Sequence, residues 1–330
     1  MIWVTWRQHR AQFLGGAIAL ALLGGILLLT GPRIASSFHD GGLASCLSTR
    51  GADCGDLADR FLNQYNNMWF VAVLFLVVPA FAGVFWGAPM VARELEQGTH
   101  RLAWTQGVTR GRWLSAKLIG ILAATVVGAA ILSISIARWS YPLVRASDDR
   151  FIPPVFDLRG IVVGGYALFA VALGVAFGTL FRRVVPAMAA TFGGYAAVRV
   201  PIDVWLRKRY MSPKVISFPL FGKGGPGIGF GRGDWILSSR IVDAAGHALS
   251  SRGGIDIDAL ASRCPSLQGV QFPGKDDLGT CLQHIGARTV NVYQPGSRYW
   301  PFQFIELGIF VLLAAGLVAF TFWWVRRRVS

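Results

Sequence analysis

The chain has 330 residues, of which 53% are hydrophobic and only 15% are charged, and its mean hydropathy is +0.48. These values exclude an ordinary water-soluble domain and place the chain among membrane proteins. The formal net charge of +15 does not indicate nucleic-acid binding. The basic residues flank apolar segments or lie in one long polar segment, so membrane topology and anionic lipid headgroups explain them better.

Apolar segments recur along the chain, and each is about long enough to cross a hydrocarbon layer of ~30 Å as a helix. Helices are expected because lipid offers no other partner for backbone polar groups. The sequence therefore predicts an all-α integral membrane protein. The predicted membrane-spanning segments are Phe13–Leu29, Met68–Met90, Leu118–Ile136, Ile161–Phe181, Val184–Val204 and Phe304–Val325.

The distribution of charge predicts the topology. Arginine and lysine concentrate in the short segments that six crossings place on the side of the two termini, which makes that side cytoplasmic by the positive-inside rule. The segment Arg207–Trp300 is also basic, but loops longer than about 60 residues escape the rule. We therefore expect a multi-pass protein of the plasma membrane with both termini in the cytoplasm. The basic residues in the short segments are Arg7, Arg10, Arg93, Arg101, Arg110, Arg112, Lys117, Arg182, Arg183, Arg326, Arg327 and Arg328.

All four cysteines fall in segments predicted to lie outside the cell. The pairs Cys46–Cys54 and Cys264–Cys281 each lie within one loop, which favours two disulfides. Free thiols are the alternative. A zinc site is disfavoured because neither pair has the spacing typical of zinc ligands and no histidine lies close by in sequence.

The chain divides into residues 1–206 with five helices, an external segment 207–300, and a final helix with a basic tail at 301–330. Residues 1–10 combine tryptophan and arginine, so they predict either a short helix on the inner leaflet or the basic flank of the first span. In the external segment, Trp235–Val242 and Arg288–Tyr293 have the composition of strands, and Ile257–Ser262 is expected to be helical.

Three charged residues lie near the predicted outer ends of spans. Arg199 and Asp203 are four residues apart, a spacing that allows them to pair on one helix face, and Glu306 lies at a similar depth in the last span. Charges inside a membrane often mark a functional site. The alternative, which we favour from sequence alone, is that these three groups lie at the interface and are satisfied by water.

Two GxxxG pairs, Gly83 with Gly87 and Gly174 with Gly178, predict close helix packing or dimer contacts. Motifs for nucleotide binding or hydrolysis are missing: there is no Walker loop, no HExxH and no GxSxG. The five histidines form no cluster, so the sequence predicts no metal site, no cofactor and no catalytic residue in this chain.

A polar segment, Ala92–Lys117, separates the second and third spans. A short helix is expected to begin at Thr99, to end near Gly107 and to present Leu102 and Trp104, while Thr109 is expected to cap the third span. A helix of about seven residues is unstable alone in water. The polar segment therefore predicts a docking site for the bilayer surface or for a partner.

The polar segment resembles the ABC-2 type membrane subunits of ATP-binding cassette exporters. Their pattern runs R-E-x-E-x-G-T, a short helix with a leucine, a turn, a serine or threonine followed by arginine, and a lysine at the start of the third span. Gln106 and Gly107 replace the usual proline of the turn. Tyr293–Phe310 also looks similar to actinobacterial permeases. The residues that match are Arg93, Glu94, Glu96, Gly98, Thr99, Leu102, Thr109, Arg110 and Lys117.

The resemblance implies that the polar segment, including Arg101, is a coupling helix that docks on a separate cytoplasmic ATPase, which holds ATP and magnesium. It implies a permease that works with a second copy of itself or a homologous permease. The apolar composition favours export of a hydrophobic or amphipathic drug, lipid or peptide. Two alternatives stay open: a membrane-anchored sensor or scaffold with an external ligand-binding cap, and a membrane enzyme that uses Arg199, Asp203 and Glu306.

Overall fold

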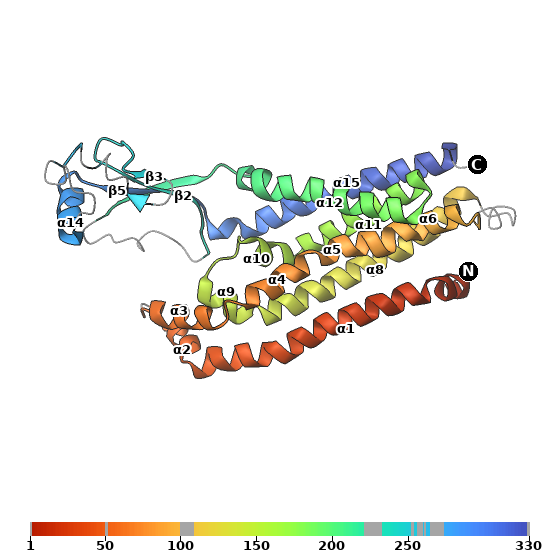
Figure 1. The fold of residues 1–330 in the computed structure, drawn as a ribbon, viewed down its shortest axis with the longest axis horizontal. Coiled ribbons are helices and arrows are strands. Elements are labelled where there is room, and N and C mark those ends of the chain that lie inside the picture. Colours follow the sequence, from red (N-terminus) through yellow and green to blue (C-terminus); the bar gives the residue numbers. More distant parts are fainter. Residues whose placement is uncertain are drawn as a thin grey trace. The chain divides into compact units, whose positions relative to one another are not determined.

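The computed structural model describes residues 2–49, 52–99, 109–220, 233–251, 254–255, 260, 262–264 and 274–328. The chain forms two compact units, the first comprising Met1–Arg207 with Trp300–Ser330 and the second comprising Lys208–Tyr299. The first unit is a bundle of long helices with short helices at one end (Figure 1). Among the residues that the structure describes, the second unit contains small sheets and the α-helix α14.

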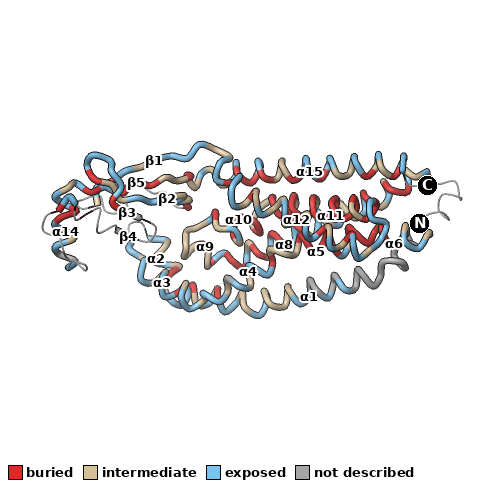
Figure 2. The backbone as a smooth tube through the Cα atoms, turned by 45° about the horizontal axis from the view of Figure 1, so that its top comes forward, coloured by how far each residue is buried: buried red, intermediate tan, exposed pale blue. Residues whose placement is uncertain are grey.

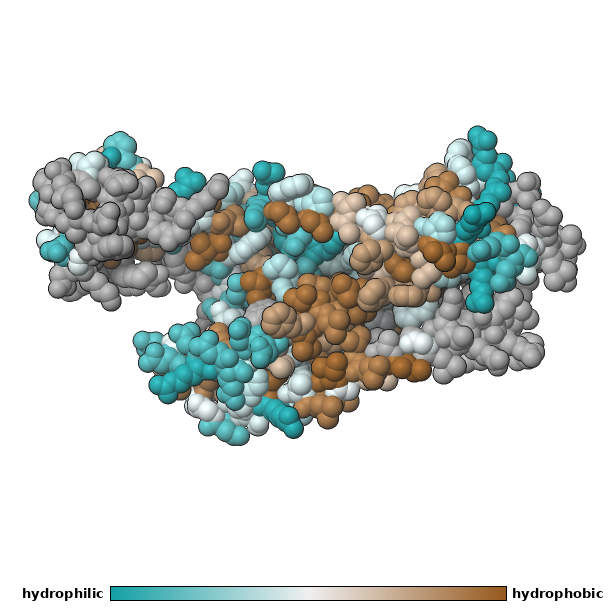
Figure 3. All heavy atoms as spheres, viewed as in Figure 1, coloured by the Kyte–Doolittle hydropathy of each residue, from teal (hydrophilic) through white to brown (hydrophobic). Residues whose placement is uncertain are grey.

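The long helices of the first unit follow the predicted apolar segments. The second segment is a run of joined helices in which η1 is a π-helical turn. Figure 3 shows hydrophobic residues over the middle of this unit and hydrophilic residues toward its ends. The elements are α1 Ile2–Asp40, α4 Met68–Leu76, α5 Val78–Ala82, η1 Gly83–Gly87, α6 Ala88–Glu96, α8 Arg110–Trp139, α11 Val162–Phe181, α12 Val184–Pro201, the π-helical turn η2 Ile202–Leu206 and α15 Tyr299–Arg328.

Among the described residues, five helices are long and apolar enough to cross a membrane. The fifth predicted span is helical, as α12, but α12 is not one of these five because it carries Arg199, paired glycines and two prolines. Figure 1 shows α1 beginning and α15 ending at the same end of the bundle. The qualifying stretches are Ala21–Asp40, Phe70–Glu96, Arg110–Trp139, Val162–Phe181 and Gly296–Arg328.

The N-terminal region differs from the expected short interfacial helix. α1 runs without a break from Ile2 to Asp40, because no glycine, proline or cap separates the basic segment from the apolar one. The helix also continues past Pro32, beyond the predicted end of the first span. Trp139 of α8 supports this extension by donating a hydrogen bond from Nε1 to Thr30 Oγ1 at 2.8 Å.

Helix α11 forms the centre of the first unit, and most of its side chains are buried (Figure 2). The two GxxxG pairs lie against each other at its contact with η1 and α6. A Cβ atom added to Gly174 would lie 2.4 Å from the carbonyl oxygen of Gly83, and one added to Gly83 would lie 2.3 Å from that of Ala170. The glycines therefore serve helix packing within the chain, where only a hydrogen atom fits.

The segment Ala137–Arg159, expected to be an external loop, folds into the bundle as two short helices, α9 Tyr141–Ser147 and α10 Pro153–Leu158. Phe156 is fully buried. Gln303 of α15 holds α10 in place, because its Nε2 donates to the carbonyl oxygen of Phe156 at 2.7 Å while its Oε1 accepts from the backbone N–H of Val162 at 3.0 Å. These hydrogen bonds satisfy backbone groups that would otherwise be unpaired in the apolar interior.

Two further short helices, α2 Leu43–Ser48 and α3 Gly55–Gln64, follow α1 in the chain. The predicted disulfide Cys46–Cys54 joins them. Their side chains Leu43 and Phe61 pack with Ile34 of α1 and Trp139 of α8 in one buried cluster. Figure 1 places α2 and α3 at the end of the bundle opposite the start of α1. This placement agrees with a pair of cysteines on the other side of the membrane from the termini.

The predicted orientation gives an expected labelling result. In intact cells, a membrane-impermeant maleimide is expected to label Cys46 and Cys54 only after reduction, because the two sulfur atoms form a disulfide and the predicted topology places them outside. Mass spectrometry of the labelled peptides measures this. Labelling that requires reduction and also permeabilised membranes would reverse the orientation.

The second unit is built around a three-stranded antiparallel sheet in the order β1-β5-β2. The predicted strands at residues 235–242 and 288–293 are confirmed, and α14 was not predicted. The disulfide Cys264–Cys281 lies in a small core with Leu249, Leu260 and Leu282. The predicted helix Ile257–Ser262 lies almost entirely outside the described residues. The elements are η3 Arg207–Arg209, β1 Lys214–Pro219, β2 Trp235–Val242, β3 Ser250–Ser251, β4 Gly254–Ile255, α14 Lys275–His284, β5 Arg288–Gln294 and η5 Gly296–Arg298.

Candidate functional site

The described ends of the polar segment connect three helices. Glu94, near the end of α6, forms a salt bridge with Lys117 in the first turns of α8, and both side chains are mostly buried. Glu96 Oε2 accepts a hydrogen bond at 3.0 Å from the backbone N–H of Val184, the first residue of α12. Each carboxylate thus connects α6 to a neighbouring helix. Glu96 does so at the N-terminus of α12, where negative charge is favourable.

Two local features of the polar segment follow the sequence. Thr109 caps α8, because its Oγ1 accepts the backbone N–H of Arg112 at 3.3 Å. Gly98 follows the end of α6 with φ of +71°, a left-handed conformation that suits glycine after a helix. The expected short helix and its residues Arg101, Leu102, Trp104 and Gly107 lie outside the described residues.

The predicted outer charges belong to a larger buried charge network. Arg199 pairs with Asp157 of α10 and lies 3.6 Å from Glu306, measured from Nη1 to Oε1. The predicted pair of Arg199 with Asp203 is wrong. Arg199 pairs with carboxylates of α10 and α15, and the partner of Asp203 is Arg207. The members of the buried charge network are Asp157, Tyr166, Arg199, Asp203, Arg207 and Glu306.

Arg207 makes the most contacts in the buried charge network and is only 1% exposed. Its Nε and Nη2 donate to the two carboxylate oxygens of Glu306 at 2.9 and 2.8 Å, which is the planar two-point geometry that suits guanidinium. Its Nη2 also lies 2.5 Å from Asp157 Oδ1, and its Nη1 lies 2.5 Å from Asp203 Oδ1. Arg207 therefore joins three carboxylates.

Tyr166 of α11 completes the buried charge network. Its hydroxyl donates to Glu306 Oε1 at 2.5 Å, and its ring lies under the guanidinium of Arg199 with 4.2 Å between Cζ and the ring centroid. Glu306 is fully buried and Asp157 is 3% exposed. The expectation that water satisfies these charges is thus wrong for Arg199 and Glu306, whose partners lie inside the bundle. Asp203 is 26% exposed and pairs with Arg207.

The π-helical turn η2 places Arg207 in this network. The backbone N–H of Arg207 donates to the carbonyl oxygen of Ile202, five residues earlier, in place of the usual four. Eight residues of regular α-helix rotate by about 800°, which leaves Arg207 about 80° away from the face of Arg199. The π-helical turn η2 takes in one residue more than an α-helical turn does, so it removes about 100° of that rotation. The two arginines therefore face the same carboxylates.

Sequence reasoning missed Asp157, Tyr166 and Arg207. Asp157 lies between the third and fourth predicted spans, where the predicted topology gives an external loop, and Arg207 is the first residue of the predicted external segment. The spacing of Asp203 and Arg207 by four residues is a helical pairing signal that was available. No sequence signal joins Asp157 to the other residues, since the contact depends on the inward folding of α10.

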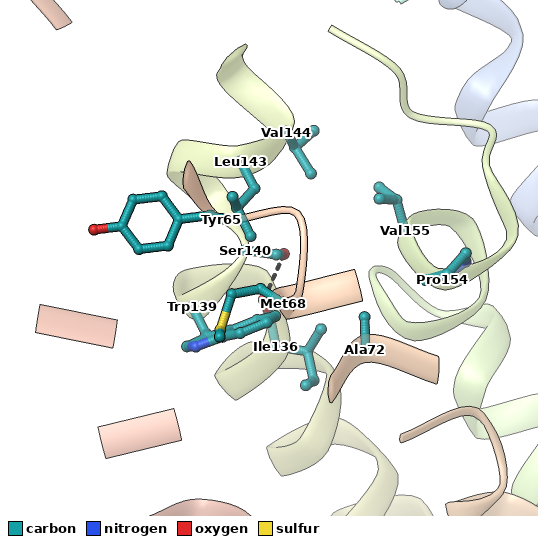
Figure 4. Close-up of a pocket in the computed structure, with 10 residues that line it drawn as sticks. All are labelled: Tyr65, Met68, Ala72, Ile136, Trp139, Ser140, Leu143, Val144, Pro154 and Val155. Atoms are coloured by element: carbon teal, nitrogen blue, oxygen red, sulfur yellow. Dashed lines mark hydrogen bonds between the residues drawn. The ribbon is translucent and has the colours of Figure 1, made fainter. Parts of the chain in front are cut away.

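A small pocket lies in the first unit near α3 and α9 (Figure 4). It carries no charged side chain, and the hydroxyl of Ser140 donates to the carbonyl oxygen of Ile136 within its own helix at 2.6 Å. Met68 and Ala72 of α4 contribute to it. The lining residues are Tyr65, Met68, Ala72, Ile136, Trp139, Ser140, Leu143, Val144, Pro154 and Val155.

Among the described residues, no group of three or more histidine, cysteine, aspartate or glutamate side chains is placed to hold a metal ion. The buried charge network also has a pattern that disfavours a metal, because each carboxylate is already paired with a guanidinium.

Comparison with protein families gives one match. The model of the family described as ABC-2 membrane transporter related matches residues 17–207, which is more than half of the chain. No curated protein and no solved structure matches the chain. The matched range contains the polar segment, both GxxxG pairs and most of the buried charge network. The chain therefore belongs to the ABC-2 membrane transporter related family and is an ABC-2 type permease, a membrane-spanning subunit of an ATP-binding cassette transporter.

Proposed function

We propose that the chain is the permease of an exporter that moves a hydrophobic or amphipathic molecule, such as a drug, lipid or peptide, out of the cell. Two copies, or one copy and a homologous permease, work with two cytoplasmic ATPases. The observation that carries this proposal is the placement of Glu94 and Glu96, which connect the flanks of the polar segment to α8 and α12. A displacement of that segment by an ATPase would be transmitted directly to these helices.

The nature of the substrate is supported by the surface of the bundle. Large apolar side chains are exposed along α8, α12 and α15, for example Ile119, Phe192 and Leu312. Such a surface is in contact with lipid, so a substrate that partitions into the bilayer has access to the permease. The test is a reconstituted system with the ATPase in vesicles, in which a hydrophobic dye is expected to stimulate ATP hydrolysis and to move across the membrane. A hydrophilic dye of similar size is the control.

The pair Glu94–Lys117 gives a separate prediction. Glu94→Lys places two like charges together, and we expect substrate-stimulated ATP hydrolysis to fall about tenfold, which corresponds to ~1.4 kcal/mol of lost coupling. The swap Glu94→Lys with Lys117→Glu restores the salt bridge and is expected to recover most of the stimulation. Membrane insertion should stay unchanged in both.

Asp56→Asn is the matched control, because Asp56 is an exposed carboxylate of α3 at the other end of the bundle. Stimulation that is unaffected by Glu94→Lys would remove this pair from the coupling mechanism. A swap variant that stays as inactive as Glu94→Lys would assign Glu94 a role that does not depend on Lys117.

A second candidate function has one observation in its favour. The second unit has its own sheet and a core with the disulfide Cys264–Cys281, so it is a folded body that can bind a ligand in a sensor or scaffold. This alternative predicts ligand binding without movement of any substrate in the same vesicles. Dye transport driven by ATP would exclude it as the principal function.

A further inference from the structure

The π-helical turn η2 lies between Arg199 and Arg207, and both arginines contact the same two carboxylates, Asp157 and Glu306. Each of the two carboxylates therefore has two positively charged partners. If Arg207 leaves, Glu306 keeps Arg199 and the hydroxyl of Tyr166, and Asp157 keeps Arg199. The buried carboxylates therefore have partners with Arg207 present and with Arg207 withdrawn.

Arg207 can leave by a simple change of backbone register. At present its N–H donates to Ile202, five residues earlier. A regular α-helical turn would bond that N–H to Asp203 instead, with no loss of a backbone hydrogen bond. The change rotates Arg207 by about 100° around the helix axis and carries its guanidinium away from Glu306. The π-helical turns found in proteins are mostly single turns of this kind, and they are frequent at functional sites.

The position of η2 supports this motion. Val204 and Trp205 are 44% and 63% exposed, so the turn can rewind on its outer side without opening the core. Arg207 is also the last residue of the first unit, where the chain leaves for Lys208–Tyr299. A rotated Arg207 lies at the end of the helical bundle, where water and lipid headgroups can receive its charge.

From these contacts we infer that η2 is a two-state register switch. In the π-helical state Arg207 joins α12 to α10 and α15 through Asp157 and Glu306. In the α-helical state Arg207 is released, and Arg199 alone holds the two carboxylates. The switch makes and breaks a connection between the outer ends of these helices.

Spin labels can measure the two states on the purified permease alone, so this test does not depend on the proposed export function. All native cysteines are in disulfides, which makes introduced cysteines the only free thiols. Leu206→Cys in η2 and Ile134→Cys in α8 are both exposed positions, 43% and 60%. Pulsed electron paramagnetic resonance in lipid nanodiscs then reports the distance between the two labels.

The labelled parent is expected to show a major distance and a second one displaced by about 8 Å, the movement of a side chain on a helix ~10–12 Å wide that turns by 100°. Deletion of Val204 removes the additional residue, so a regular helix then presents Arg207 to the carboxylates in a single register. This variant is expected to show one distance. Val204→Ala, which keeps the chain length, is the matched control and should retain both.

Glu306→Gln supplies a second variant that keeps the chain length. It weakens the two-point contact that Arg207 makes with Glu306 in the π-helical state, so it is expected to raise the population of the second distance severalfold. A single distance in the parent that Glu306→Gln leaves unchanged would overturn the inference, whether or not the deletion variant folds. Two distances that persist after deletion of Val204 would also overturn it, because the second would not arise from the π-helical turn.

Discussion

Replacing Glu306 by methionine is expected to destabilise the permease by about 3–5 kcal/mol, the loss typical when one partner of a buried ion pair is removed. Glu306 is fully buried and accepts two hydrogen bonds from Arg207 and one from Tyr166. The substitution leaves two arginines in the interior against Asp157 and the partly exposed Asp203. The measurement is the apparent melting temperature of the purified protein in detergent.

The double substitution Glu306→Met with Arg207→Met tests whether an unbalanced buried charge causes this loss of stability. It removes one positive and one negative charge, and Arg199 keeps Asp157. We expect it to recover most of the lost stability, because methionine side chains can replace a buried ion pair without loss when they pack well. Leu312→Met in the same helix is 73% exposed and should change the melting temperature little. A double variant as unstable as Glu306→Met would mean that shape, and not charge balance, sets the stability here.

Gly174→Ala is expected to cost about 1–3 kcal/mol, the usual effect of an additional methyl group in a well-packed core. The new Cβ atom would lie 2.4 Å from the carbonyl oxygen of Gly83 and 2.6 Å from the backbone nitrogen of Ala88. Both neighbours are backbone atoms, so α11 would have to move away from η1 and α6. Thermal unfolding in detergent measures the change.

Gly164→Ala is the matched control, since it lies in the same helix and its Cβ atom would meet nothing within 4 Å. It should be neutral or slightly stabilising, because alanine favours a helix by ~0.8–1 kcal/mol over glycine. Equal losses at the two positions would contradict the close contact between α11 and the second span.

The sequence was sufficient for the features that depend on local chemistry. Hydropathy located the long helices, the spacing of glycines predicted close packing, and Thr109 was identified as the cap of α8. The two disulfides followed from their closeness in sequence. Each of these features is set by residues near one another in the chain or by the need to bury apolar surface.

The features that depend on tertiary contacts could not be predicted. Asp157 follows two prolines in a polar stretch, which reads as a loop until α10 is seen to be held by Gln303. Arg207 follows a segment with Asp203 and Pro201, which reads as the end of a span. Only the π-helical turn brings it back to the face of Arg199. The burial of Arg199 and Arg207 was not predicted, because the groups that surround the two guanidinium groups come from three other helices, α10, α11 and α15.

The proposed function requires that a cassette ATPase attach to this permease through the polar segment. Affinity purification of the tagged permease, co-expressed with the cassette ATPases of its own cell and followed by mass spectrometry, tests this attachment. The expected result is one kind of cassette ATPase in stoichiometric amount, which is lost when Ala92–Lys117 is replaced by a flexible linker of equal length in a variant that still inserts in the membrane. Recovery of the permease alone, or retention of the ATPase by the linker variant, would contradict it.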